Sequence, residues 1–189
     1  MLRIILPLLF FFSLFPMYSQ EDCNYKIQYE LDDDNFILTH EQLAEFMVGK
    51  DQNVFIYFSL MKEGPVKSLV LQVSLNAVEM PPIMCFDKTS RIIFQLEDKS
   101  YASLAYLGET ICGRQSEPEN QLKNSIVEAA FFLDEENLNR LKSSPIETMR
   151  ITTMKTNFDI VFQEVISNKA IEEPIYPKEY FLKYLDCIE

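Results

Sequence analysis

The chain has 189 residues, and 29 Asp and Glu against 17 Lys and Arg give it a formal charge of −12 at pH 7. An excess of carboxylates repels phosphate backbones, so nucleic acid is excluded as an expected partner. Fifteen Phe and nine Tyr, with no Trp, supply the filling for one sizeable hydrophobic core.

The first twenty residues, MLRIILPLLFFFSLFPMYSQ, have the pattern of a secretory signal peptide. Arg3 precedes an almost wholly apolar run at residues 4–15, and Ser19 offers a small residue for cleavage. The run is too short for a comfortable membrane span, and no later segment approaches 18 apolar residues. We therefore expect a signal peptide at residues 1–19 and a single secreted or periplasmic domain at residues 20–189, with no membrane span after cleavage.

The mature chain begins with alternating apolar and polar residues at 24–31, which predicts a strand with one buried face. Three aspartates form a turn, and a short apolar strand follows at residues 36–38. Residues 39–49 are then predicted to be a helix. Thr39 and Gln42 match a capping box, apolar residues recur at helical spacing, and Gly49 is a natural stop.

Further strands are predicted from apolar runs at residues 53–64 and 66–80, and a hairpin from residues 91–96 and 101–107 around a turn at 97–100. Residues 113–125 are polar and predict the main exposed loop. A buried strand at 125–133, a helix capped by Asp134, and a hairpin turning near residues 155–157 follow. Pro177 starts a C-terminal helix with an apolar stripe.

Strands outnumber helices, and most connections are too short for parallel crossovers. The expected fold is α+β: a mainly antiparallel twisted sheet or partial β-sandwich with two or three short helices, including the C-terminal amphipathic helix.

Four cysteines in an exported chain favour disulfides over a zinc site, and three pairings are formally open. Cys85 and Cys112 are equidistant from the centre of the turn at residues 97–100, so an unbulged hairpin would bring them together. By exclusion Cys23 would then pair with Cys187.

The residues that suggest chemistry do not form a recognisable site. Neither Asp32 nor Asp33 starts a calcium-binding EF-hand loop, because apolar residues occupy the required ligand and glycine positions. His40, the one histidine, is expected to be an exposed first-turn residue. Two glycines at 108 and 113 have the spacing of a P-loop but lack the Lys that triphosphate binding requires. We expect no catalytic, cofactor or metal residues.

Residues 36–46 and 131–141 share four of eleven identities, and both have the pattern of a strand that ends in a capped helix. Internal duplication and the general similarity of capped strand-to-helix junctions both explain this resemblance.

These observations favour an exported, non-enzymatic binding or structural domain. Its expected partner is a protein or an envelope component, contacted through residues 113–125 or through free sheet edges. One alternative is a small secreted hydrolase that uses the acidic turn and Glu41, and another is a disulfide-braced inhibitor.

Overall fold

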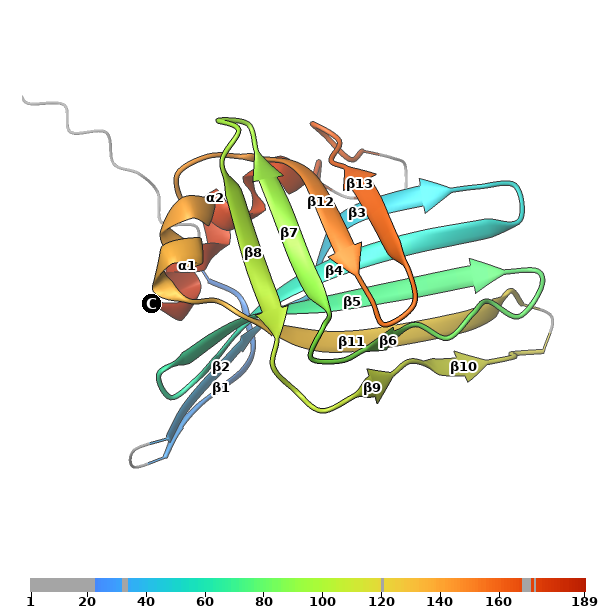
Figure 1. Ribbon diagram of the computed structural model, residues 1–189, viewed down its shortest axis with the longest axis horizontal. Helices are drawn as coiled ribbons and strands as arrows, with labels where there is room; N and C mark the ends of the chain where they lie inside the picture. Colours follow the sequence, from blue (N-terminus) through green and yellow to red (C-terminus); the bar gives the residue numbers. More distant parts are fainter. Residues whose placement is uncertain (1–22, 32–33, 120, 168–170, 172) are drawn as a thin grey trace, which may run out of the picture.

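An antiparallel sheet makes up most of the structure, a computed structural model that describes residues 23–31, 34–119, 121–167, 171 and 173–189 (Figure 1). The strands are β1 (Tyr25–Leu31), β2 (Asp34–Thr39), β3 (Gln42–Val48), β4 (Gln52–Glu63), β5 (Val66–Ala77), β6 (Cys85–Phe86), β7 (Arg91–Leu96), β8 (Tyr101–Tyr106), β9 (Ile111–Cys112), β10 (Arg114–Ser116), β11 (Lys123–Phe132), β12 (Ile146–Thr152) and β13 (Asn157–Val161). The helical segments are α1 (Glu135–Leu141), η1 (Pro177–Glu179), α2 (Tyr180–Tyr184) and η2 (Leu185–Ile188). The predicted α+β class and the C-terminal helix are confirmed.

The strands form one large sheet that doubles over into two layers. Its order is β1-β2-β4-β5-β11-β8-β7-β12-β13, with β3 beside β4 and β10 beside β11. The long strands β4, β5 and β11 lie side by side, and β8, β7, β12 and β13 cross in front of them at a steep angle (Figure 1). The right-handed twist of adjacent strands accumulates over such a path and brings two faces of the same sheet together.

An aromatic cluster fills the space between the two layers. The Phe58 ring on β4 lies 6.0 Å from that of Phe94 on β7, and Phe181 of α2 lies 5.1 Å from Phe94. All three side chains are at most 1% exposed. The C-terminal helical segment thus fills one end of the core, as its apolar stripe predicts, and each large side chain buried there stabilises the fold by about 2 kcal/mol or more.

The β4–β5 hairpin belongs to the layer that β4, β5 and β11 form. The register of this hairpin is fixed by its turn. Gly64 has a φ of 54°, which favours glycine, and it occupies the first central position of a two-residue turn between Glu63 and Val66. The register from this turn directs alternate apolar residues of β5 inward, and Leu69 and Leu71 are fully buried.

The predicted helix at residues 39–49 is wrong, because the chain forms strand β3 there. Ala44 is an extra residue in the pairing of β3 with β4, and this bulge directs both Ala44 and Glu45 inward. The bulge breaks the strict alternation of a strand and imitates helical spacing. Thr39 caps no helix, since its Oγ1 accepts a hydrogen bond from the Leu60 amide at 2.9 Å.

Residues 36–46 and 131–141 therefore resemble each other in sequence but do not share the predicted strand-to-helix structure. The second stretch is a strand followed by α1, whose Asp134 cap accepts a hydrogen bond from the Asn137 amide as predicted. The first stretch is a strand followed by another strand.

Glu45 links the β3 side of the folded-over sheet to the β13 side. Glu45 is only 2% exposed, and its carboxylate accepts hydrogen bonds from the Gln163 amide at 2.9 Å and from the Gln163 side chain at 2.6 Å. Gln163 follows β13, whereas Glu45 belongs to β3. A side chain thus spans the gap at which no strand pairing between β3 and β13 is described.

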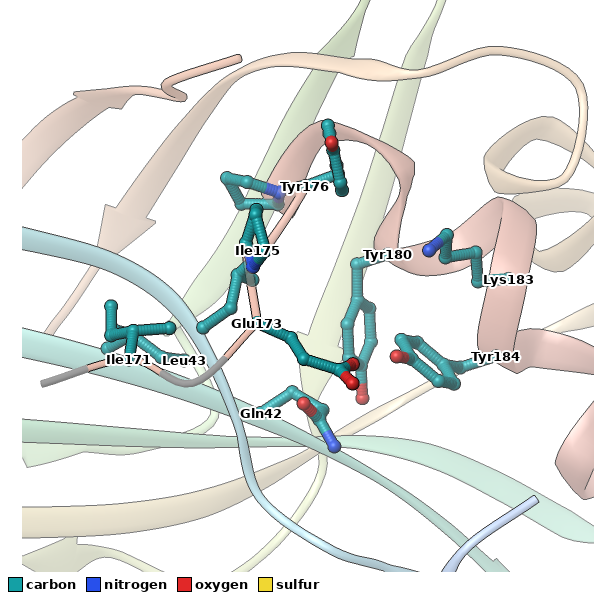
Figure 2. Close-up of a pocket in the computed structure, with 11 residues that line it drawn as sticks. Gln42, Leu43, Ile171, Glu173, Ile175, Tyr176, Tyr180, Lys183 and Tyr184 are labelled. Carbon is teal, nitrogen blue, oxygen red and sulfur yellow. The ribbon is translucent and has the colours of Figure 1, made fainter. Parts of the chain in front are cut away.

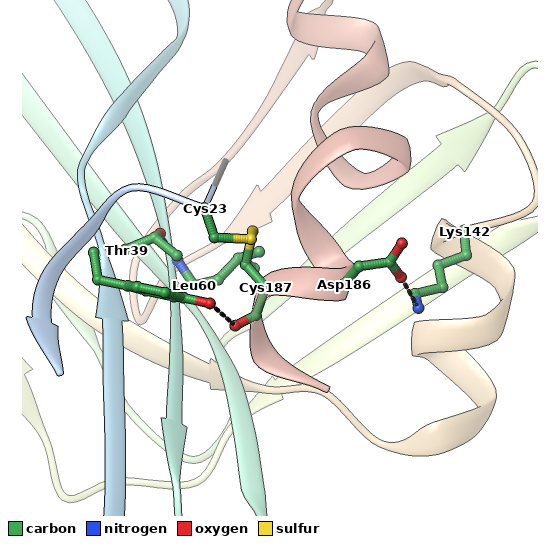
Figure 3. Close-up of a disulfide and its surroundings, with 7 residues drawn as sticks. Cys23, Thr39, Leu60, Lys142, Asp186 and Cys187 are labelled. Atoms are coloured by element: carbon green, nitrogen blue, oxygen red, sulfur yellow. Dashed lines mark hydrogen bonds and ion pairs between the residues drawn. A yellow bond between two sulfur atoms is a disulfide. The ribbon is translucent and has the colours of Figure 1, made fainter. Parts of the chain in front are cut away.

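Two disulfides fasten the chain, and their pairing is the one that the sequence predicts. Cys23 is joined to Cys187 with a Cα–Cα distance of 5.6 Å (Figure 3). Tyr25 donates a hydrogen bond to the Cys187 carbonyl. Cys85 is joined to Cys112 across the small β6–β9 ladder. Two disulfides indicate an exported domain in an oxidising environment.

The predicted β7–β8 hairpin is confirmed, although its register differs slightly from the one assumed. Arg91 pairs with Ala105, so the hairpin is centred on Asp98 rather than between Asp98 and Lys99. Across the described residues, we find no helix with the length and apolar character that crossing a membrane requires.

Candidate functional site

Of the hypothetical acidic site, the structure describes Glu41 and His40, whereas Asp32 and Asp33 lie outside the described residues. Glu41 forms an ion pair with Lys26, and this hydrogen bond holds the pKa of Glu41 below its ordinary value. His40 is exposed and lines a small cavity in which the described residues include no carboxylate. Within the described ranges, Glu41 is therefore engaged by Lys26, and no three His, Cys, Asp or Glu side chains are grouped to hold a metal.

The predicted loop at residues 113–125 is only partly an exposed loop, because residues 114–116 form the exposed strand β10 and residues 123–125 belong to β11, where Ser125 is buried. Arg114 pairs with Ile126 and Ser116 with Asn124, so β10 extends the sheet beside the first part of β11. At the other end of β11, Phe131 and Phe132 pair with β8. Between these two pairings, residues 127–130 have a strand partner only on the β5 side.

The direction of the backbone groups identifies which main-chain atoms face this gap. The Leu133 amide donates to the Lys67 carbonyl of the β5 side at 2.9 Å. Since neighbouring residues of an antiparallel strand direct these groups to opposite sides, Glu128 and Ala130 direct theirs away from β5. Their amide and carbonyl groups have no strand partner there among the described residues.

A groove of about 350 Å³ adjoins these backbone groups. One side of it is the chain from Tyr106 to Ile111, which leaves β8 and bows away from β11 before it joins β9 (Figure 1). Its floor belongs to the outer face of the sheet and is largely apolar. The floor residues on this face are Met61, Val66, Ser68, Val70, Glu128, Ala130 and Phe132.

Apolar side chains at this end of the sheet are exposed to an unusual degree. Val66 is 44% exposed and Leu107 is 65% exposed, and Ile27 of β1 is 42% exposed on the same outer face. An antiparallel sheet with one buried face normally has polar residues on the other. Exposed apolar side chains that line a groove, as Val66 and Leu107 do, are typical of a binding site.

The wall opposite β11 is held in place at both of its ends. The Tyr106 hydroxyl donates to the Glu109 carbonyl at 2.6 Å, and burial, with a smaller contribution from the charge of Glu109, raises the pKa of the phenol. At the far end, Cys112 is tied to Cys85 and the Gly113 amide donates to the Met84 carbonyl at 2.9 Å. The groove is therefore preformed, which lowers the entropy cost of binding.

Sequence reasoning indicated sheet edges and residues 113–125 as places to look, but it did not identify Glu128 or Ala130. Residues 125–133 have the pattern of a continuous buried strand. Nothing in that pattern shows that, on the edge away from β5, neighbouring strands pair only with the two ends of β11. The exposed Glu128 within an apolar run was the available signal.

No protein-family model, curated protein or solved structure matches this chain.

Proposed function

We propose that the mature chain is a single exported domain, secreted or periplasmic, that binds an extended segment of a partner protein. The observation that carries this proposal is the stretch of β11 at Glu128 and Ala130, which on the side away from β5 has no strand partner among the described residues and which lies beside a preformed apolar groove. An extended peptide can add to such an edge through main-chain hydrogen bonds, with its alternate side chains placed in the groove.

The charge of the site favours a particular kind of segment. Glu128 is exposed and is the one charged residue among the described residues that line the groove. The whole chain is also strongly acidic. The expected partner segment is therefore apolar at alternate positions and carries a basic residue opposite Glu128.

The two alternative functions have less support from the geometry. A hydrolase needs converging carboxylates, and Glu41 is instead paired with Lys26. An inhibitor of the kind considered above presents a projecting loop, whereas residues 114–116 are paired with β11.

The test begins with selection of random linear peptides displayed on phage against the purified domain. A synthetic version of an enriched peptide is then titrated against wild type, Ala130→Arg and Ser116→Arg. The Ala130 side chain lines the groove, so an arginine there fills it, and we expect at least tenfold weaker binding. Ser116 is exposed on β10, away from the groove lining, and its substitution should leave the affinity within about twofold.

Hydrogen exchange identifies the contact directly. Bound peptide should slow exchange at the Glu128 and Ala130 amides, which face the gap. The proposal is wrong if no peptide is enriched, if the peptide binds Ala130→Arg as tightly as wild type, or if Ser116→Arg is the variant that abolishes binding.

A further inference from the structure

The edge of β11 that borders the groove is occupied at both ends of the gap. Ile126 pairs with Arg114 of β10, and Phe131 pairs with Tyr106 of β8. The stretch between these pairs, residues 127–130, spans roughly 13 Å of strand. A strand added to this edge therefore cannot continue along β11 in either direction, so each of its ends must stop there or bend out of the sheet.

The wall of the groove sets the same limit on length. The chain between β8 and β10, residues 107–113, is longer than the stretch 127–130 that it passes, and it bows away from β11 (Figure 1). The space that this bow leaves is about 350 Å³. That volume is near the lower end of the range for ligand pockets, roughly 300–1,000 Å³. The groove therefore accommodates a few residues of a chain and no folded element.

A chain end meets this limit more readily than an internal segment does. An internal segment of a folded partner would have to enter and leave the groove within about four residues, with a sharp bend at each end. A chain end needs one bend only. Fewer fixed bends cost less conformational entropy on binding.

The charge beside the groove distinguishes between the two kinds of chain end. Glu128 is the one charged residue in the described part of the lining. Lys26 of β1 has a raised pKa, mainly because it is hydrogen-bonded to Glu41, and the charges of Glu41 and Glu128 add smaller contributions. Two carboxylates thus share one ammonium group. A terminal carboxylate would be repelled here, whereas a terminal ammonium is attracted.

A larger cavity elsewhere in the molecule provides a comparison. It has a volume of about 460 Å³ and lies between β3 and the C-terminal helical segment, where Figure 2 shows the Gln42 and Glu173 side chains directed into it. Its described lining includes groups of both charges, Glu173 and Lys183. The β11 groove, by contrast, adjoins main-chain groups without a strand partner among the described residues, and the charge in its described lining is negative.

We infer that the β11 groove binds the free amino terminus of a partner protein, with the first residue beside Glu128 and about four residues along β11. This inference rests on the proposed function, because it specifies which part of the partner occupies the same groove. The positive charge expected opposite Glu128 is then the ammonium of the terminus itself.

The test uses the mature domain and a peptide enriched in the phage selection. The peptide is synthesised with a free amino terminus, with an acetylated one, with Gly-Ser-Gly-Ser added before it, and with the same residues added after it. Acetylation removes the ammonium charge, and the residues added in front meet β10, so we expect each to weaken binding at least tenfold. The addition at the carboxy terminus should leave the affinity within about twofold.

Two variants of the domain connect this effect to one carboxylate. In Glu128→Gln, the free and the acetylated peptide should bind within about twofold of each other, because the charge that distinguishes them is gone. Glu79→Gln removes the same charge from an exposed residue between β5 and β6, outside the groove lining, and should keep the tenfold difference. Both positions are exposed, so both variants should unfold at the temperature of wild type.

The inference is overturned if the acetylated or the amino-terminally extended peptide binds as tightly as the free one. It is also overturned if Glu128→Gln keeps the tenfold difference, or if the carboxy-terminal addition is the change that abolishes binding. In these cases the proposed function stands, provided that the peptide binds wild type and not Ala130→Arg. If no peptide is enriched, or if Ala130→Arg binds normally, the proposed function fails and this inference fails with it.

Discussion

The two disulfides fasten regions that differ in almost every other respect. Cys187 is 4% exposed and lies in η2, where Leu185 and Ile188 are fully buried against the core. Cys112 is exposed and lies in a ladder of two residues per strand. The Cys23–Cys187 bridge reinforces a region that is already held by buried side chains. The Cys85–Cys112 bridge holds an exposed region that has few buried side chains of its own. The same bond thus supports the fold in one region and positions a groove wall in the other.

Removal of the Cys23–Cys187 bridge should have the largest effect on stability. It joins residues 164 apart in sequence, and the chain-entropy model gives roughly 5 kcal/mol for a loop of that length. We expect Cys23→Ala with Cys187→Ala to lower the free energy of unfolding by several kcal/mol in urea titrations. A loss below about 1 kcal/mol would show that packing of the C-terminal segment alone secures this corner.

Removal of the Cys85–Cys112 bridge should have a smaller global and a larger local effect. The separation is 27 residues, for which the same model gives roughly 3–4 kcal/mol as an upper limit. Cys85→Ala with Cys112→Ala should speed amide exchange at residues 107–112 and weaken peptide binding in the β11 groove. If exchange there matches wild type, the hydrogen bond from Gly113 to Met84 suffices to hold the wall.

Two tyrosines sharpen the comparison within the C-terminal region. The Tyr25 hydroxyl donates to the Cys187 carbonyl at 3.1 Å, whereas the Tyr180 hydroxyl has no partner among the described residues. We expect Tyr25→Phe to lower stability by about 1 kcal/mol and Tyr180→Phe to leave it unchanged or raise it. Equal losses in thermal unfolding of the two variants would contradict this difference.

The smallest expected effect concerns the Lys26–Glu41 pair near the same corner. The pair lowers the pKa of Glu41 from its ordinary value near 4.5, so the folded chain binds this proton less readily than the unfolded chain. The contribution of the pair to the free energy of unfolding is present above that value and is lost as the pH falls through the lowered pKa. Because both side chains are about a third or more exposed, we expect less than about 0.5 kcal/mol.

Glu41→Gln should therefore flatten the fall in unfolding free energy between about pH 5 and about pH 3, with no change at neutral pH beyond the small loss of the pair. A matched Glu63→Gln variant, at a carboxylate in the β4–β5 turn, serves as the control. If both variants follow the wild-type pH profile, the ion pair adds nothing to stability in solution.

The sequence predicted most strands because their alternation was regular, as in residues 24–31, or because turns bounded them, as at Gly64. It mispredicted β3 because the bulge at Ala44 disrupts alternation, and because pairing with the 12-residue β4 overrides local helix preference. The cysteine pairing was accessible because one pair lies across a short hairpin.

The candidate site could not be predicted, for a different reason. The groove depends on where β10 stops and β8 begins along β11. This relation leaves no local pattern in the residues themselves, because it arises from the spatial arrangement of distant segments.

The bond between Glu45 and Gln163 has a consequence for how the chain reaches this fold. Its partners are 118 residues apart, whereas half of the neighbouring strand pairs in the sheet, such as β4 with β5 and β7 with β8, are joined by short turns. Contacts of such long separation form only after nearer pairings have reduced the entropy of the chain. We therefore expect the two layers of the sheet to come together late in folding. We also expect the native molecule to open first where β3 and β13 face each other.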